Sequence, residues 1–447
     1  MESCTVPSSV ECAPLVRDDV GDVWAGGSIG PPSPAPSTRI PIEVLESIID
    51  YMERSALPIA ALVCTAWYPR AMYNLYYKVE LHTRRSYDVL FKLTRTSSRI
   101  KGWLATTCEL VASNPQVKAS LSLEEGALRK HARFLHALPP ALGRVMSGVQ
   151  ILTLKGLHHP MPITFFLGLT QFESLKSLRL SNCTLNNISQ LRRIISAFPR
   201  LTDLALYGDI LTPQSLASHE GARVQFHPES DIRLRRLTLD ARGDARKFRP
   251  IIYWIVGSKI CHSLDELTIG WIGKPSRDIE AVDRLLRSAG PTLTRYSETA
   301  DLSNWHGNLI QNTVLRSLDC TLTDINPQGP TRDNWFKLVT KLRSVLSTVK
   351  SHQLRRIGLR CGIMLYDSAY GQLNVVPEEL DLHRLHEVMS RSYFDVLEDV
   401  EVKMLLFDAR ERSEDEVDDI SRRIADVFHT LLQPWSDRGI VNVCWTQ

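Results

Sequence analysis

Two histidines near the C-terminal end have a spacing that could bind a metal ion. His383 and His386 lie three residues apart on an expected helix, and Asp381 lies just before them. Two imidazoles and a carboxylate on one face of a helix are ligands that zinc and related metals accept. Histidines on the surface of a charged helix are far more common than metal ligands. We therefore expect a solvated helix face here and no metal.

The other polar clusters give no catalytic constellation. His158 and His159 open an expected loop before Pro160, where a solvated polar pair is the default interpretation. The basic stretch DARGDARKFR (240–249) is interpreted as a solvated loop, with a patch for an acidic partner as the alternative. The phosphate-binding patterns G-x-G-x-x-G and G-x-x-x-x-G-K-[ST] and the zinc-protease pattern H-E-x-x-H do not occur. We therefore expect no enzyme activity, no catalytic residue and no cofactor.

Length, composition and net charge indicate a globular protein of more than one module and give no sign of nucleic-acid binding. The chain has 447 residues, more than one core usually serves, so two modules or an elongated repeat array are expected. Hydrophobic residues make up 43% and charged residues 23%, as in ordinary globular proteins. The net charge of +3 is close to neutral for this length and gives no argument for nucleic-acid binding.

Cysteine usage and apolar runs indicate the compartment. The apolar runs ITFFLGL and IIYWIVG are too short to cross a bilayer, so no membrane association is expected. The N-terminal residues contain early acids and no apolar segment of the kind found in a secretory signal. Nine cysteines are scattered singly, an odd number without a C-x-x-C pair. This usage favours reduced thiols in the cytoplasm or the nucleus.

The first eighty residues divide into a tail and a patterned module. Residues 1–37 end in GGSIGPPSPAPS and are predicted to be a disordered tail rich in Pro, Gly and Ser. Residues 38–80 show three short apolar stripes at helical spacing. The stripes are Ile42, Leu45, Ile48, Ile49 and Met52; then Ile59, Leu62, Val63, Ala66 and Trp67; then Met72, Leu75, Tyr76 and Val79. Three helices of this length form only a marginal core, so the module needs something to pack against.

A second pattern fills the rest of the chain. The phrase L-x-x-L-x-L recurs eight times, and its last two apolar positions alternate as a short strand requires. The phrases begin at Val149, Leu175, Leu201, Leu234, Leu264, Leu315, Leu354 and Leu397. Helical stripes lie between them, for example Leu191, Ile194, Ile195 and Phe198. A further amphipathic stripe from Val417 to Leu431 and a last strand in GIVNVCW complete a terminal unit.

The strand and helix alternation predicts an α/β repeat fold. The first phrases start 26 residues apart, a period typical of leucine-rich repeats, and later gaps are longer. We predict a helical linker or cap over 81–145 and a degenerate leucine-rich-repeat domain over 146–447, forming a solenoid with a curved, mostly parallel sheet. An ordinary α/β domain whose strands begin with leucine is the alternative.

The stretch that begins at residue 39 resembles an F-box. Ile40-Pro41, Glu43, Val44-Leu45 and Ile48-Ile49 match the start of the family pattern, in which a leucine is usual at the place of Ile40. The signature Leu-Val-Cys-x-x-Trp follows at the expected distance as residues 62–67. Pro58, near the start of the second helix, departs from the pattern and is tolerable only within a first turn.

The resemblance implies a receptor subunit of a cullin–RING (SCF-type) ubiquitin ligase. Its F-box would bind a Skp-type adaptor and, through it, a cullin, while the repeat body would recruit an unidentified protein substrate. Pro41, Ile40 and Leu45 are the expected direct contacts, whereas Trp67 is expected to pack inside the module with Val63 and Ile48. The residues assigned to adaptor binding are Ile40, Pro41, Val44, Leu45, Ile48, Leu62, Val63, Cys64 and Trp67.

A second function remains open on the sequence. The chain could be a leucine-rich-repeat scaffold or binding protein whose first helices cap the solenoid, without a role in a ligase. A cap would direct Ile42, Leu45 and Ile49 into the first repeat. An adaptor-binding module would leave part of that set exposed in the isolated chain.

Overall fold

The computed structural model describes residues 41–113, 125–158, 161–211, 232–242, 248–272, 279–299, 307–322, 331–364, 380–407 and 413–446. The predicted tail over 1–37, Ile40, His159 and the middle of the basic stretch at 243–247 lie outside the described residues.

Three short helices form the N-terminal module, as the stripes predict, but Val79 of the third stripe lies in a strand and not in the third helix. They are α1 (Ile42–Asp50), α2 (Leu57–Val63) and α3 (Tyr68–Tyr77). Pro58 and Pro69 both lie in first turns, where a missing backbone N–H costs no helical hydrogen bond. The predicted second helix is too long: α2 ends at Val63 because Cys64 is fully extended.

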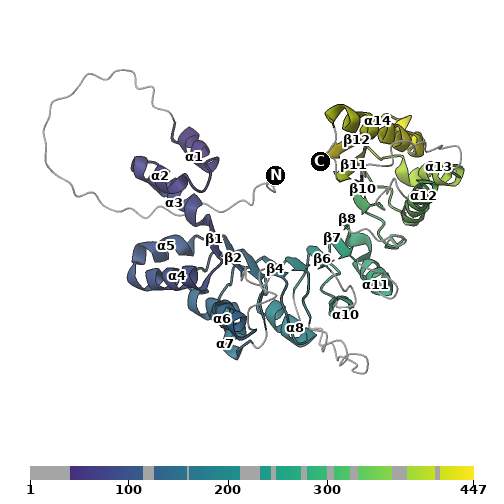
Figure 1. The fold of residues 1–447 in the computed structure, drawn as a ribbon. Helices are drawn as coiled ribbons and strands as arrows, with labels where there is room; N and C mark the ends of the chain where they lie inside the picture. Colours follow the sequence, from purple (N-terminus) through teal and green to yellow (C-terminus); the bar gives the residue numbers. More distant parts are fainter. Residues whose placement is uncertain are drawn as a thin grey trace, which may run out of the picture.

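Twelve strands form one sheet in which every neighbouring pair is parallel and the strand order follows the sequence. The sheet curves as an arch, with the module at one end and the C-terminal strand at the other (Figure 1). The strands are β1 (Lys78–Leu81), β2 (Glu109–Ser113), β3 (Ile151–Lys155), β4 (Ser177–Ser181), β5 (Asp203–Tyr207), β6 (Arg236–Arg242), β7 (Glu266–Ile272), β8 (Arg295–Glu298), β9 (Ser317–Thr321), β10 (Arg356–Met364), β11 (Asp399–Phe407) and β12 (Val441–Thr446).

The recurring leucines form ladders along the core side of the sheet. Leu152 of β3 lies beside Leu178 of β4, which lies beside Leu204 of β5, and each of these side chains is buried. All eight L-x-x-L-x-L phrases overlap strands, and GIVNVCW overlaps β12. The α/β repeat solenoid with its curved parallel sheet is therefore confirmed.

Three strands carry no complete phrase and were missed. In β8 the ladder positions hold Tyr296 and Glu298, and in β2 the second position holds Ala112. The sheet already starts at β1, ahead of residue 146. The predicted helical linker over 81–145 therefore contributes β2 to the sheet as well as helices. A polar or small residue at a ladder position explains why β8 and β2 lack the leucine phrase, although their backbone pairing continues. Strand β1 was missed because its Val79 was assigned to the stripe of the third helix.

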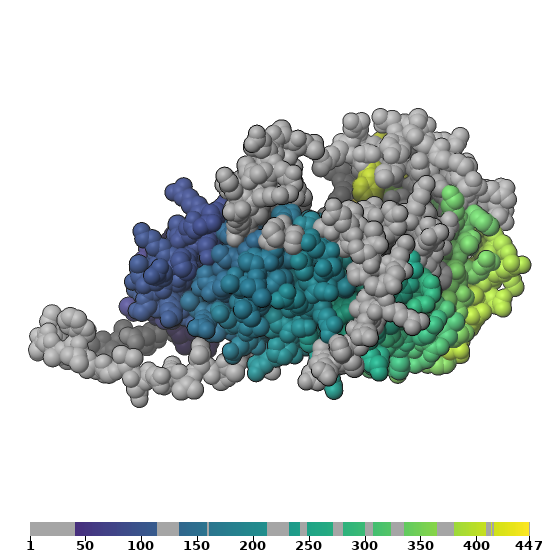
Figure 2. All heavy atoms as spheres, turned by 90° about the horizontal axis from the view of Figure 1, so that it is seen from below, coloured from purple at the N-terminus to yellow at the C-terminus, as the bar shows by residue number. Residues whose placement is uncertain are grey.

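Helices cover the outer side of the arch and leave the other face of the sheet as an inner face (Figure 1). From below, consecutive segments of the body follow one another in sequence order from purple to yellow (Figure 2). The helices are α4 (Arg84–Thr96), α5 (Ser98–Ala105), α6 (Glu125–Leu142), α7 (Ile163–Leu169), α8 (Ile188–Ser196), α10 (Arg249–Gly257), α11 (Ile279–Ala289), α12 (Thr331–Thr348), α13 (His383–Met389), α14 (Glu414–Leu431) and α15 (Gln433–Ser436).

Two of the histidines considered as polar clusters make packing contacts in the fold. His386 lies on α13 with its Nε2 atom 3.2 Å from the carbonyl oxygen of Leu431, a packing contact. His158 is half-buried with its Nδ1 atom 2.9 Å from Thr184 Oγ1, so the prediction of a solvated residue is wrong there; burial lowers its pKa. Within the described segments, no group of three or more metal-ligating side chains comes together, and no helix is long and apolar enough to span a bilayer.

Candidate functional site

The N-terminal module has its own small core, separate from that of the body. Its buried members are Ile49, Leu57, Ala60, Ala61 and Ala71. Three alanines at the contact between α2 and α3 let the two helices approach closely, because small side chains leave little between the backbones. The module therefore buries few large side chains of its own.

Helix α1 carries two apolar stripes one residue apart. Ile49 is 1% exposed and faces the module core, with Met52 partly buried against it. Val44 is 46% exposed and Ile48 44% exposed, four residues apart on a helix face turned about 100° away. One broad stripe in the sequence is thus divided between the core and the surface.

Helix α2 is apolar on all sides. Its inward positions are Leu57, Ala60 and Ala61, whereas the larger Ile59, Leu62 and Val63 point outward at 71%, 85% and 60% exposure. A helix that is apolar all round is normally buried, and among the described residues nothing covers its outer side. We call the exposed large side chains of α1, of Tyr51 just after it and of α2 the apolar set: Ile42, Val44, Ile48, Tyr51, Ile59, Leu62 and Val63.

Most of the predicted site residues lie on the surface. Pro41, Val44, Ile48, Leu62, Val63 and Cys64 are exposed, Leu45 and Trp67 are half-buried, and Ile40 lies outside the described residues. Trp67 packs against the module core as predicted, but the expectation that Val63 and Ile48 pack with it is wrong. The alanines fill the place that those larger side chains were expected to take.

Sequence reasoning missed three exposed members of the apolar set. Ile42, Tyr51 and Ile59 were not assigned to the site, and Tyr51 is 92% exposed. The signal was present for Ile59, because it shares the Ile59, Leu62 and Val63 stripe. Leu62 and Val63 of that stripe were assigned to the adaptor contact, whereas Ile59 was left out of the assignment.

A polar cluster fixes α1 against α3. Arg70 donates from Nε to Asp50 Oδ1 at 2.6 Å and from Nη2 to Asp50 Oδ2 at 2.5 Å, and Asn74 donates to Asp50 at 2.8 Å. The hydrogen bonds from Arg70 are the main reason that the pKa of Asp50 lies below its usual value. This two-pronged contact sets the position of α1, and with it the outward direction of Val44 and Ile48.

Helix α3 joins the module to the body. Leu75 packs against the module core, whereas Tyr76 packs against the core of the body. The Tyr68 ring meets Trp103 of α5 edge-on at 6.1 Å, and the Arg99 guanidinium lies 4.6 Å from the centre of the Tyr68 ring. The module is therefore held at the start of the solenoid through both apolar and cation–π contacts.

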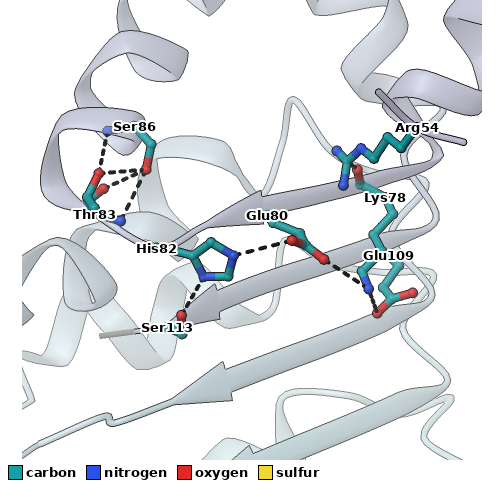
Figure 3. A network of polar contacts seen from close by, with 8 residues as sticks. All are labelled: Arg54, Lys78, Glu80, His82, Thr83, Ser86, Glu109 and Ser113. Carbon is teal, nitrogen blue, oxygen red and sulfur yellow. Dashed lines mark hydrogen bonds and ion pairs between the residues drawn. The ribbon is translucent and has the colours of Figure 1, made fainter. Parts of the chain in front are cut away.

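The first two strands are tied together by polar contacts on the inner face (Figure 3). Lys78 Nζ lies 2.9 Å from Glu80 and 3.5 Å from Glu109, and Arg54 donates to the carbonyl oxygen of Lys78. His82 bridges Glu80, at 3.2 Å, and Ser113 Oγ. The hydrogen bond from Lys78 lowers the pKa of Glu80. These contacts link the loop before α2 to β1 and β1 to β2.

Comparison with protein-family models identifies the module. Residues 37–69 match the model of the F-box domain. The N-terminal module is therefore similar to an F-box domain. The matched range covers α1, α2 and the first residues of α3, and it contains every residue that the sequence assigned to the site. Curated proteins show no significant match to the chain. F-box domains generally bind Skp1-type adaptors, so the apolar set lies on a domain whose general role is adaptor binding.

Proposed function

We propose that this protein is the substrate-recognition subunit of an SCF-type ubiquitin ligase. Its F-box binds a Skp-type adaptor and, through it, a cullin, and its repeat body recruits a target protein. The observation that carries the proposal is the apolar set, which stays exposed after the module has formed its own core. Large exposed apolar side chains grouped on one small module are typical of a protein interface.

The exposure of α1 and α2 favours this function over a solenoid cap. A cap would bury Ile42, Leu45 and Ile49 against the first repeat. Ile42 is 46% exposed, Leu45 is half-buried, and Ile49 is buried in the module's own core. The body's core receives Tyr76 from α3 and no member of the apolar set.

The adaptor contact is assigned to residues of both helices. Pro41, Val44, Leu45 and Ile48 act from α1 together with Ile40, and Leu62, Val63 and Cys64 act from the end of α2. Trp67 acts indirectly, by packing against the module core that holds α2 in place. The rate of ubiquitin transfer is raised because the recruited target is held close to the ligase's ubiquitin-carrying partner, so the chain itself needs no reacting group.

Co-purification with a Skp-type adaptor tests the proposal. Leu62→Asp removes the most exposed aliphatic member of the apolar set, and Leu167→Asp on α7 is the matched control, since Leu167 is 64% exposed and lies in the body. Burying a leucine contributes about 1.5–3 kcal/mol, so Leu62→Asp weakens adaptor binding by about tenfold to a hundredfold.

Both variants should unfold at nearly the wild-type temperature, because substitutions at exposed positions change the free energy of unfolding by about 0.5 kcal/mol or less. Loss of adaptor in Leu62→Asp alone supports the proposal. A folded wild-type chain that retains no adaptor refutes it and favours the scaffold function. Equal retention by both variants shows that Leu62 lies outside the contact.

A further inference from the structure

The inner face of the sheet carries many charges, and most of them are paired. Arg236 contacts Asp203 through two nitrogens at 2.7 and 2.8 Å, and Lys78 lies 3.5 Å from Glu109. Asp203 and Glu109 are the only acids at inner-face positions of β2 to β5, and both are engaged by these cations. Each inner-face carboxylate of β2 to β5 therefore already lies against a cation, with Lys78 shared between Glu109 and Glu80.

Two cations in the same region are not paired. Lys155 lies on β3 between Ser113 and Ser181, and Arg179 lies on β4 between Thr153 and Ala205. Both side chains are exposed, and within the described segments neither makes an ion pair or a hydrogen bond. Their neighbours are hydroxyl-bearing or small, so this part of the inner face has two free positive charges and no carboxylate to balance them.

The surroundings suit an extended peptide. Tyr207 of β5 lies beside Ser181 of β4 and adds a further hydroxyl to this part of the face, and Ala205 leaves the space beside Arg179 open. Neighbouring strands lie about 4.8 Å apart and two residues span about 6.6 Å, so the Cα atoms of Lys155 and Arg179 are about 8 Å apart. Alternate side chains of an extended peptide have a similar spacing of about 7 Å.

We propose that the inner face of β3 and β4 binds an acidic peptide segment with carboxylates on alternate residues. One carboxylate pairs with Lys155 and the other with the fork of Arg179, whose two parallel N–H donors match a carboxylate. Ser181 and Tyr207 supply further hydroxyl donors. The inference rests on the proposed function only in assigning this segment to the recruited target protein.

Fluorescence anisotropy on the full chain tests the inference. The probe is a labelled peptide with Asp and Glu on alternate residues. Its controls are the same peptide with Asn and Gln, and one with a single phosphoserine. Lys155→Glu/Arg179→Glu reverses the two free charges. Lys101→Glu/Arg144→Glu is the matched variant, because both residues are exposed and lie outside the sheet.

We expect the acidic peptide to bind wild type and the matched variant equally, more weakly at higher salt. The affinity of Lys155→Glu/Arg179→Glu for the acidic peptide should be about tenfold or more lower than that of wild type. The single variant Arg179→Lys, which keeps the charge but not the fork, should have an intermediate affinity. Equal binding to the two reversed variants overturns the inference, as does binding of the phosphoserine peptide without the acidic one. Adaptor retention, measured in parallel, should be unchanged in all variants. Its loss from wild type would instead count against the proposed function.

Discussion

Two adjacent isoleucines on α1 separate folding from binding. Ile49 is 1% exposed in the module core, whereas Ile48 is 44% exposed on the apolar set. Truncating a buried isoleucine to alanine costs about 2–5 kcal/mol through lost burial and the cavity left behind. The small module stands on its own core, so we expect Ile49→Ala to unfold α1 to α3 locally while the solenoid stays folded.

The effect of Ile48→Ala follows from the part of its side chain that is still exposed. Full burial of isoleucine contributes about 1.5–3 kcal/mol. With 44% of the residue left to bury, its burial against the adaptor contributes about 0.7–1.3 kcal/mol. That amount corresponds to a rise of roughly three- to tenfold in the Kd for the adaptor. The folding of the module should change little.

Hydrogen exchange resolves the two variants. In Ile49→Ala the amides of α1 to α3 should exchange about a hundredfold faster, which is what a loss of about 3 kcal/mol predicts, while amides of β3 to β7 keep their protection. In Ile48→Ala the exchange rates should match wild type, and only the Kd should rise. If Ile48→Ala speeds exchange as much as Ile49→Ala, the division of α1 into a core stripe and a surface stripe is wrong.

Three further predictions follow from individual contacts. The hydrogen bonds from Arg70 are the main cause of the lowered pKa of Asp50 in the folded state. Their stabilisation of the α1–α3 contact is therefore present above the unfolded-state pKa of Asp50, near 3.8, and is lost as the pH falls through the folded-state pKa. Because both side chains are more than a third exposed, the loss is under about 1 kcal/mol, and Asp50→Asn should remove this pH dependence from exchange measured between pH 3 and 5. Burial raises the pKa of the Cys183 thiol to about 11, so an alkylating reagent at pH 8 should leave Cys183 unmodified in mass spectrometry while exposed Cys64 reacts. Bound adaptor should slow the reaction at Cys64, and unchanged labelling of Cys64 would place it outside the contact. Gly208→Ala should destabilise the body by more than about 1 kcal/mol in denaturant unfolding, because its φ is +68° and a Cβ there would clash with Asn182 Oδ1. Gly102→Ala, in open space on α5, should instead stabilise by about 0.5–1 kcal/mol, and equal effects at both glycines would contradict the geometry.

The sequence predicts the strands correctly where the leucines recur with a regular period. Leucines at alternating positions can only be buried together if their strands align in register, which is why the phrases predicted β3 to β7 and β9 to β11. Strand β8 was missed because its ladder position holds Glu298, whose Oε1 accepts hydrogen bonds from Tyr296 at 2.7 Å and from the Gly307 backbone at 3.0 Å. A buried carboxylate that accepts hydrogen bonds through one oxygen looks polar in the sequence, and only the fold shows that it belongs to the core.

The amino-acid sequence alone determined that the module has three short helices, that it carries the residues of an F-box and that a parallel α/β body follows. These features depend on the spacing of residues close together in the chain, which can be read directly from the sequence. Only the tertiary structure decided which apolar residues of α1 and α2 face outward. Both sides of α2 are apolar, and the alanine side packs inward because Ala60 and Ala61 allow close contact with Ala71 of α3. That packing turns Leu62 and Val63 to the surface, and no periodicity in the sequence distinguishes the two sides.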